Sequence, residues 1–284
     1  MNKTHPQPQV IVLDGFDDLR VNDIRFLQEA QRLGSVHVFL YSDQAYQTAY
    51  GKPPKFKLDE RKYYLESIRY TRQVSTIEIH DPGVFITNKK FLNADDQRII
   101  WAVRERTADK TLEKRSLEHD IEYAVIPDSA LAGFPNENAK KETIEEISKP
   151  TVMVSGCFDW VHTGHVRFFE EASAYGDLYV VVGHDENLRL LKGEGHPLFP
   201  QEERKYWVQS IRFVKKAIIS TGHGWLDAEP QILSIKPDVY IVNEDGDRPE
   251  KRTFLRQHQI DYIVLEREPK PGLPRRISTD LRGF

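Results

Sequence analysis

The sequence has little cysteine and no long apolar run. Its 284 residues include a single cysteine, Cys157, so no intrachain disulfide can form, which is typical of proteins in a reducing cytoplasm. No apolar stretch approaches the roughly 18 residues of a membrane-spanning helix, and residues 1–9 lack the apolar core of a signal peptide. We therefore expect a cytoplasmic protein with no membrane partner.

The chain also lacks a strong excess of charge of either sign. Its 40 Lys and Arg and 44 Asp and Glu give a net charge of −4, so there is no general basic field for nucleic acid. We expect no nucleic-acid partner. A hydrophobic content of 39% with 30% charged residues suffices for packed cores, and the length suggests two domains.

What the sequence does contain is an internal duplication. Residues 15–30 align without gaps with residues 157–172, and six of the sixteen pairs are identical. Further matches, in the same order, pair 59–63 with 202–206, 67–69 with 210–212 and 121–123 with 260–262. These matches indicate two copies of one unit. We expect a first domain over residues 1–135, a linker over 136–149 and a second domain over 150–284.

Each copy is predicted to be an α/β unit. In the second copy, strands rich in Val and Ile are expected at 152–155, 178–182, 217–219, 239–242 and 262–265. Helical patterns lie between them, and one over 202–214 places Trp207, Ile211 and Val214 on one face. Apolar strands that alternate with helices indicate a parallel sheet covered on both faces, with ligands bound beyond the carboxyl ends of the strands.

The clearest functional motif opens the second copy. It is Gly156-Cys157-Phe158-Asp159-Trp160-Val161-His162-Thr163-Gly164-His165, between a short apolar strand and an amphipathic helix. A helix N-terminus favours a phosphate, because it offers unpaired N–H groups and the positive end of the peptide dipole. His162 and His165 are expected to point to the same side, and Gly164 lets a phosphate approach the backbone. Two imidazoles there suit a reaction that builds negative charge on phosphorus; the alternative is a pair of histidines that only cap the helix.

This motif resembles the H-x-G-H signature of the cytidylyltransferase family, a branch of the nucleotidyltransferase superfamily. The resemblance implies two tandem Rossmann-like domains and an enzyme that joins a nucleoside triphosphate to a phosphorylated alcohol and releases pyrophosphate. It also implies that Gly156, Cys157, Phe158 and Gly164 contact the nucleotide, with Cys157 a small turn residue rather than a nucleophile. Class I aminoacyl-tRNA synthetases have a related H-I-G-H motif, but the chain lacks their K-M-S-K-S partner and an anticodon-binding region.

The same resemblance implies further catalytic and nucleotide-binding residues. Lys192 is similar to the family lysine that reaches the phosphates, and would act with His162 and His165; a solvated loop lysine is the alternative. Arg204 is similar to a nucleotide-binding arginine, but the first copy keeps an arginine at Arg61, which equally favours a structural role.

Three other segments complete the predicted site. The chain end resembles the family's second signature, R-T-x-G-I-S-T-T, whose hydroxyl and N–H groups would hold the β- and γ-phosphates. Its members here are Arg276, Ile277, Ser278 and Thr279. Asn243 and Asp245 follow the fourth strand, where relatives contact the nucleotide. Asp185 falls where relatives place a carboxylate near the acceptor, although a turn or cap role competes.

The first copy lacks this chemistry. Arg20-Val21-Asn22-Asp23 replaces the H-x-G-H residues, and Asp23 would repel a triphosphate. We expect a catalytically inactive first domain; the weaker alternative is that it binds another ligand through Arg20. The two-copy arrangement is similar to that of ethanolamine-phosphate cytidylyltransferases, where the first copy normally has the intact signature. Residues 68–71 and 211–214 resemble the dimer contact of single-copy relatives, which predicts an internal pseudo-dimer and leaves a further homo-oligomer open.

The implied reaction uses CTP and a small phosphorylated acceptor: an amino-alcohol, glycerol, polyol or sugar phosphate, or a phosphonate. Mg²⁺ is expected to be carried by the nucleotide, without a metal site formed by protein side chains. The Gln201–Arg204 segment and Ile-Ser-Thr favour CTP. ATP-using relatives, which include heptose-phosphate and FAD-forming enzymes, share H-x-G-H, so ATP is the alternative donor. A non-catalytic nucleotide-sensing protein is a third hypothesis.

Overall fold

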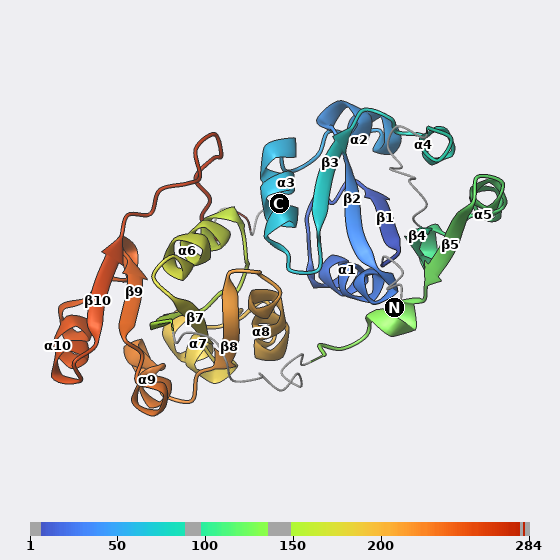
Figure 1. Ribbon diagram of the computed structural model, residues 1–284. Coiled ribbons are helices and arrows are strands. Elements are labelled where there is room, and N and C mark those ends of the chain that lie inside the picture. The colour runs from blue at the N-terminus through green and yellow to red at the C-terminus, as the bar shows by residue number, and fades with distance from the viewer. Residues whose placement is uncertain (1–6, 89–97, 136–148, 279–280, 282–284) are drawn as a thin grey trace. The chain divides into compact units, whose positions relative to one another are not determined.

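The chain folds as two compact units. The computed structural model describes residues 7–88, 98–135, 149–278 and 281 (Figure 1). The units are Met1–Gly133 and Phe134–Phe284. The predicted linker, 136–149, lies outside the described residues apart from Lys149. Packing of the halves as a pseudo-dimer stays a prediction. In the part of the chain that the structure describes, no helix has both the length and the apolar character needed to cross a membrane.

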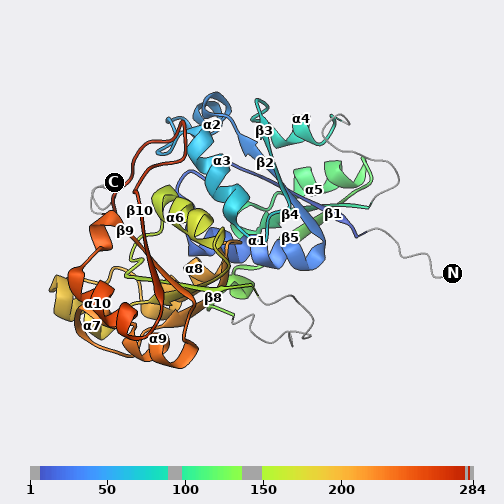
Figure 2. The same cartoon turned by 60° about the vertical axis from the view of Figure 1, so that its left-hand side comes forward.

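The first unit is a five-stranded parallel sheet in the order β3-β2-β1-β4-β5. Its strands are β1 (Gln9–Asp14), β2 (Ser35–Tyr41), β3 (Gln73–Ile77), β4 (Ile99–Arg104) and β5 (Ile121–Ile126). Its helices are α1 (Val21–Leu33), α2 (Asp43–Tyr50), α3 (Leu58–Ser67), α4 (Pro82–Phe85) and α5 (Lys110–Leu117), with short 3-10 turns η1 (Glu105–Thr107) and η2 (Asp128–Leu131). Helices α1 and α3 lie over the same face of this sheet (Figure 2).

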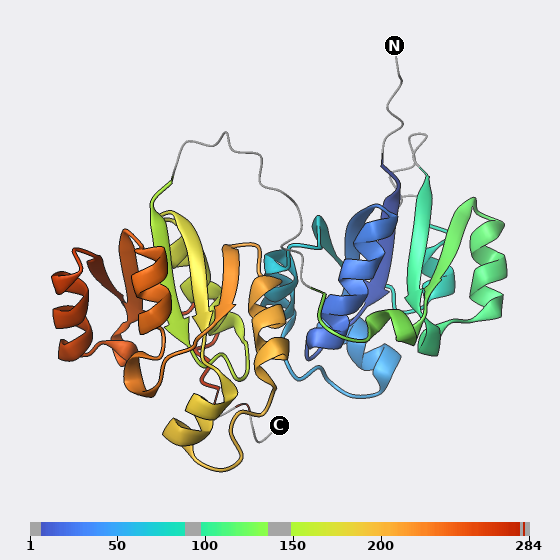
Figure 3. The ribbon, with the colours of Figure 1, turned by 90° about the horizontal axis from the view of Figure 1, so that it is seen from below.

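The second unit repeats this arrangement, with the order β10-β9-β6-β7-β8. Its strands are β6 (Thr151–Gly156), β7 (Asp177–Val182), β8 (Val214–Ile219), β9 (Val239–Asn243) and β10 (Asp261–Leu265). Its helices are α6 (Thr163–Ser173), α7 (Asp185–Lys192), α8 (Gln201–Gln209), α9 (Glu229–Ile235) and α10 (Pro249–Gln257), with η3 (Gly224–Leu226) and η4 (Glu244–Gly246). From below, helices are visible on both sides of each sheet (Figure 3).

The topology fixes where a ligand would bind. In each unit the first strand lies between the second and the fourth, so the chain changes its direction of winding beside that strand. A crevice forms at such a point, beyond the carboxyl ends of the strands. Helices α1 and α6 begin there, directly after β1 and β6. The prediction of two tandem α/β units is therefore confirmed.

Apolar strand residues form the cores, as expected for sheets covered on both faces. Val152, Met153 and Val154 of β6 are fully buried. Each of the five strands predicted for the second copy lies inside an observed strand. The helix predicted over 202–214 is wrong at its end, because α8 stops at Gln209 and Val214 opens β8. Ile211 and Val214 are buried in either arrangement, so their spacing could not separate a helix from a turn and strand.

Candidate functional site

The signature turn of the second unit has a strained backbone. Phe158, between β6 and α6, has a φ of +48°, a left-handed conformation that is uncommon for a bulky residue. Its ring is buried and packs over Gly156, where an added Cβ would lie 2.8 Å from it. The same ring meets His165 edge to face, with 5.4 Å between centroids. Gly156 and Phe158 therefore form the surface against which the His165 ring packs.

The two histidines of the signature lie together at the start of α6, as predicted from their spacing. His162 is the N-cap residue, and its Nδ1 accepts a hydrogen bond from the Gly164 N–H at 3.1 Å. The His162 N–H in turn donates to Nδ1 of His165 at 3.4 Å. The ring centroids are 4.1 Å apart. Because a backbone N–H occupies each Nδ1, we assign the proton of both neutral rings to Nε2.

Burial keeps both imidazoles neutral. His162 is 4% exposed, and burial, with smaller effects from Arg267 and Arg276, lowers its pKa to about 3. Burial also holds the pKa of His165 well below its ordinary value, helped by charges on neighbouring groups. The Nε2 of His162 has no hydrogen-bond partner among the described residues. Both rings are thus Nε2–H donors without a positive charge; His165 lines the cavity described next, whereas His162 does not and its Nε2 is buried.

A cavity of about 250 Å³ opens beside this pair, at the carboxyl ends of β6 and β9. It brings together many of the predicted site residues, namely Gly156, Cys157, Phe158, Gly164, His165, Lys192, Asn243, Asp245 and Ser278. Lys192 is the exposed last residue of α7, so its ammonium group is free to move over the opening. Ser278 reaches the Trp160 carbonyl at 3.5 Å.

Other predicted residues lie outside the cavity lining. Arg276 follows the last strand, and its carbonyl oxygen lies 3.5 Å from the position that a Cβ on Gly164 would take. Ile277 is 40% exposed. Thr279 lies outside the described residues.

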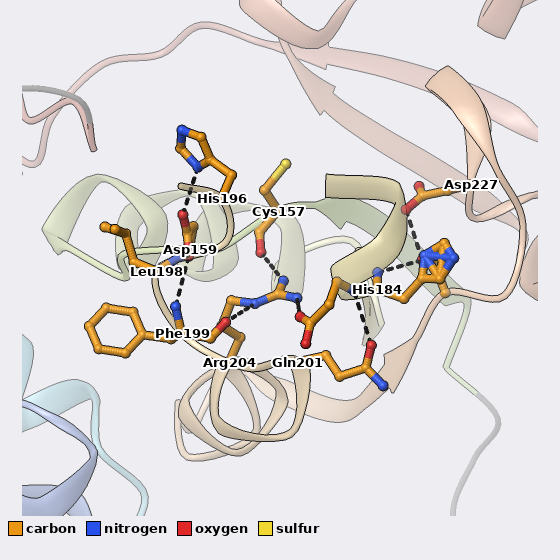
Figure 4. Close-up of polar contacts among 11 residues, drawn as sticks. Cys157, Asp159, His184, His196, Leu198, Phe199, Gln201, Arg204 and Asp227 are labelled. Carbon is orange, nitrogen blue, oxygen red and sulfur yellow. Dashed lines mark hydrogen bonds and ion pairs between the residues drawn. The ribbon is translucent and has the colours of Figure 1, made fainter. Parts of the chain in front are cut away.

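Arg204 lies in a polar network with Cys157 and Phe199 of neighbouring segments (Figure 4), and the half-buried Asp185 is another of its partners. Arg204 is fully buried and donates to the carbonyl oxygens of Phe199 at 2.8 Å and Cys157 at 2.6 Å. Its remaining amino group donates to Asp185 at 2.7 Å. The network ties the signature turn to the starts of α7 and α8.

The first unit contains the same network. Arg61 donates to the carbonyl oxygens of Phe56 and Gly15 and to Asp43, at 2.9, 2.6 and 2.7 Å. Since the half without the signature histidines keeps these bonds, the geometry gives Arg204 and Asp185 a structural role. Direct contact of either residue with a substrate stays a prediction.

Two basic residues of the cavity were missed from sequence. Lys251, in the first turn of α10, is 9% exposed, and its ammonium group donates to the Gly246 carbonyl at 3.2 Å. Among the described residues, no carboxylate lies within 4.0 Å of it, and burial lowers its pKa. Arg267, two residues after β10, pairs with Asp245. Both follow strand ends closely, which is the signal that could have identified them.

The cavity therefore has a cationic lining. Lys192, Lys251 and Arg267 outnumber the carboxylates of Asp159 and Asp245. Asp159 is already engaged, since it accepts the N–H groups of Leu198 and Phe199 and contacts His196 at 3.1 Å (Figure 4). Within the described residues, no group of three or more His, Cys, Asp or Glu side chains could hold a metal ion.

Comparison with known proteins identifies the family. A model of cytidylyltransferase-like domains matches residues 153–279, all within the second unit. The FAD synthase of Thermococcus kodakarensis is 34% identical over 128 residues, which cover 43% of this chain and 81% of that protein. The chain belongs to the cytidylyltransferase-like family of the nucleotidyltransferase superfamily.

A second relative and a solved structure are similar over different shares of their length. The bifunctional protein HldE of Aliarcobacter butzleri is 36% identical over 121 residues, 39% of this chain but 25% of that protein. Among solved structures, a lipopolysaccharide core biosynthesis protein from Thermoplasma volcanium is 23% identical, with a TM-score of 0.36. That similarity covers 43% of this chain and 98% of the solved one.

Proposed function

We propose that the second half transfers a nucleotidyl group from a nucleoside triphosphate, with ATP favoured as donor, to a small phosphorylated acceptor. The observation that supports this most directly is the neutral His162–His165 pair at the N-terminus of α6, beside a cavity lined by Lys192, Lys251 and Arg267. Hydrogen-bond donors and mobile cations at one point suit a triphosphate whose charge shifts during reaction.

The reaction balances without a general base. A phosphate oxygen of the acceptor, already ionised near neutral pH, attacks the α-phosphorus in line with the leaving group. The new P–O bond forms as the bond between the α-phosphorus and the bridging oxygen breaks, and that electron pair leaves with pyrophosphate. The products are a nucleoside-diphosphate-linked compound and pyrophosphate. Positioning and charge stabilisation account for the rate enhancement.

The histidines would act as hydrogen-bond donors rather than as acids. Each Nε2–H would donate to a non-bridging or leaving oxygen, because each Nδ1 is occupied by a backbone N–H. Lys192 ends a helix at the mouth of the cavity and would follow the α-phosphate as its geometry changes. Lys251, buried without a carboxylate within 4.0 Å in the described part of the chain, would gain a counter-ion from the bound phosphates.

The choice of ATP over CTP rests on the relatives and on Arg204. The relatives include several archaeal FAD synthases, and FAD consists of FMN joined to an adenylyl group. The Gln201–Arg204 segment no longer favours CTP. Arg204 is buried, and its hydrogen bonds are repeated by Arg61 in the first half, which lacks the signature. CTP remains the second candidate through the Ile-Ser-Thr segment.

Mg²⁺ would be held chiefly by phosphate oxygens and water. No cluster of three carboxylate, histidine or thiolate groups lies in the described residues, which suits an ion that keeps several waters. When bound, the ion would neutralise part of the phosphate charge. The remaining contacts to the phosphates would come from side chains of the protein.

The test is pyrophosphate release by the full chain with Mg²⁺. ATP and CTP are each combined with FMN, glycerol 3-phosphate, phosphoethanolamine and several sugar phosphates, and His165→Asn serves as the inactive control. Turnover with ATP and one acceptor, lost in His165→Asn, is the expected result. Turnover with CTP alone would contradict the choice of donor. Tight triphosphate binding without turnover on any acceptor would identify a nucleotide sensor instead.

A further inference from the structure

The first unit contains a cavity at the place that corresponds to the candidate active site. Its volume is about 410 Å³, and it lies at the carboxyl ends of β1 and β4. The corresponding strands of the second unit, β6 and β9, border the cavity described above. Nothing in the proposed reaction uses the first cavity.

The two cavities can be compared position by position. Strands β1 and β6 have six residues each, and helices α2 and α7 have eight residues, an aspartate at the start and a glycine after the end. The turns η1 and η4 follow β4 and β9 directly. The cavity-lining pairs that result are Asp14 with Gly156, Asp18 with Trp160, Asp23 with His165, Tyr50 with Lys192, Arg106 with Asp245 and Leu112 with Lys251.

These replacements reverse the charge of the cavity. Asp14, Asp17, Asp18 and Asp23 line the first cavity against two guanidinium groups, Arg104 and Arg106. The second cavity has three cations against two carboxylates. The carboxylates that are new in the first cavity stand where the signature turn of the second unit would receive phosphate. A triphosphate is therefore repelled, and the favoured occupant is cationic.

Asp14 is the carboxylate most open to a new positive partner, since both oxygens of Asp17 are engaged by the Lys55 and Phe56 N–H groups and the Tyr46 hydroxyl. Asp18 already pairs with Arg20 and Lys55, at 2.8 and 2.9 Å, and Asp23 pairs with Arg104 at 2.6 Å. Asp14 instead accepts from the Gly15 N–H and from the Tyr50 hydroxyl at 3.2 Å, and its nearest guanidinium, Arg104, is 4.0 Å away.

Aromatic rings surround this carboxylate. Tyr46 and Tyr50 pack with 4.5 Å between ring centroids, and Tyr41 lies 6.3 Å from Tyr50. On the opposite wall Trp101 meets Tyr123 edge to face at 5.3 Å. All five line the cavity. A carboxylate among aromatic faces is the environment that attracts organic ammonium groups.

A buried hydrogen-bond donor points independently to a ligand. Trp101 is 3% exposed, and its Nε1–H has no partner among the described residues. In the second unit the residue at this place is Tyr240, whose hydroxyl bonds to Ser155 at 2.5 Å. Leu13 replaces that serine in the first unit, so the partner of the buried donor is lost. Such a donor is costly unless something accepts its hydrogen bond.

We propose that the first half binds a small, non-phosphorylated organic cation that also carries a hydrogen-bond acceptor. The ammonium group lies against Asp14 among the tyrosine rings, and the acceptor takes the indole N–H of Trp101. This inference goes beyond the proposed transfer reaction and does not depend on it.

The test is calorimetric titration of the full chain with choline, glycine betaine and ethanolamine. The uncharged isostere of choline, 3,3-dimethylbutan-1-ol, is the matched control. We expect at least one cation to bind at least about tenfold more tightly than the isostere. Asp14→Asn, which keeps the oxygen that accepts from Gly15 and Tyr50, weakens that binding at least about tenfold. His165→Asn, in the other half, leaves it unchanged.

Trp101→Phe provides a second variant, because it keeps one aromatic ring and removes the indole N–H together with the second ring. We expect it to weaken binding about threefold to tenfold, through the lost hydrogen bond and the smaller aromatic contact. The proposal would be overturned if none of the three ammonium compounds bound more tightly than the isostere, or if none of them bound at all. Cation binding that survives Asp14→Asn and Trp101→Phe but is lost in His165→Asn would assign it to the other half and equally overturn it.

Discussion

The two halves share one fold and differ in the chemistry at the same edge of the sheet. Both have a phenylalanine with positive φ after the first strand, with φ of +42° at Phe16 and +48° at Phe158. Both use a residue in the first turn of the next helix to accept the preceding N-cap N–H: Asp23 in one half and His165 in the other. Strain and capping therefore belong to the fold, because they persist without the histidines.

The comparison separates scaffold from chemistry. Asp17 accepts the N–H groups of Lys55 and Phe56, and Asp159 accepts the corresponding groups of Leu198 and Phe199. Arg61 and Arg204 likewise donate to carbonyl oxygens at corresponding positions of the two turns. Of the groups given a role in the proposed reaction, His162, His165, Lys192 and Lys251 are replaced in the first half by Arg20, Asp23, Tyr50 and Leu112. An aspartate can replace His165 as a cap, but it cannot donate to a phosphate oxygen at neutral pH. The proposed reaction of the second half thus depends on a small set of hydrogen-bond donors and cations placed on a scaffold that both halves share.

The largest expected effect is the loss of one imidazole donor. His165→Asn keeps a side chain that can accept from the His162 N–H and removes the Nε2–H. Loss of one donor to a developing oxyanion lowers kcat by about 10²–10³. Pyrophosphate release at saturating substrate measures it. His258→Asn, at an exposed histidine of the same half, is the control, and equal loss in both variants would contradict the role of His165.

Removal of the buried arginine tests the scaffold in both halves alike. Arg204→Met leaves two carbonyl oxygens and one carboxylate without their donor, and Arg61→Met leaves three carbonyl oxygens and one carboxylate. The expected loss is about 3 kcal/mol of unfolding free energy in the half concerned. Urea unfolding, followed separately for each half, measures it. If Arg204→Met lowered turnover without lowering stability, while Arg61→Met changed only stability, Arg204 would contact the nucleotide after all.

Sequence patterns predicted the frame and the donors, but not the network between them. The duplication located the first strand, the turn and the helix of each half, and the spacing of His162 and His165 placed their rings together. The burial of Arg204 depends on Phe199, Cys157 and Asp185, which come from three separate segments. No local sequence pattern shows that these three segments meet around Arg204. The family resemblance therefore predicted that Arg204 binds the nucleotide.

The residues missed from sequence have a different cause. Lys251 and Arg267 lie on segments whose relation to the cavity depends on how β9 and β10 are placed in the sheet. The acidic, aromatic cavity of the first half was missed because its residues come from β1, α2, β4 and β5, and only together do they surround one space. A comparison of paired positions in the two copies could have shown the change from Lys192 to Tyr50.

The buried histidines predict an acid sensitivity in both halves, because burial also lowers the pKa of His37 in the first half to about 4. The pKa of His162 is lowered to about 3 in the folded chain, against about 6.5 when unfolded. Its neutral form therefore contributes stability above about pH 6.5, and this is lost as the pH falls toward 3. By about pH 4.5 the loss amounts to about 2–3 kcal/mol in the second half.

Unfolding of each half at pH 7 and at about pH 4.5 measures the loss, and a variant of the second half should leave the loss from His37 in the first half unchanged. The double variant His162→Gln, His165→Gln should flatten the acid loss in the second half. In the same range, kcat/KM should show no inflexion near pH 6.5 from either histidine. An inflexion near 6.5 that disappears in the variant would mean that the rings titrate normally in the free protein.

The smallest effect concerns Gly164 and its counterpart Asn22. A Cβ on Gly164 would lie 2.9 Å from Cε1 and 3.0 Å from Nδ1 of His162, so the ring must shift by a few tenths of an ångström. Gly164→Ala should therefore lower turnover about tenfold, because His162 is displaced from its cap and from the phosphate. Helix propensity offsets any loss of stability, since alanine is favoured over glycine in a helix by about 1 kcal/mol.

Asn22→Ala, at the corresponding place in the first half, should change stability by less than about 0.5 kcal/mol and leave turnover unaltered. Pyrophosphate release and urea unfolding of both variants decide the matter: full activity in Gly164→Ala would show that the His162 ring position does not limit the reaction.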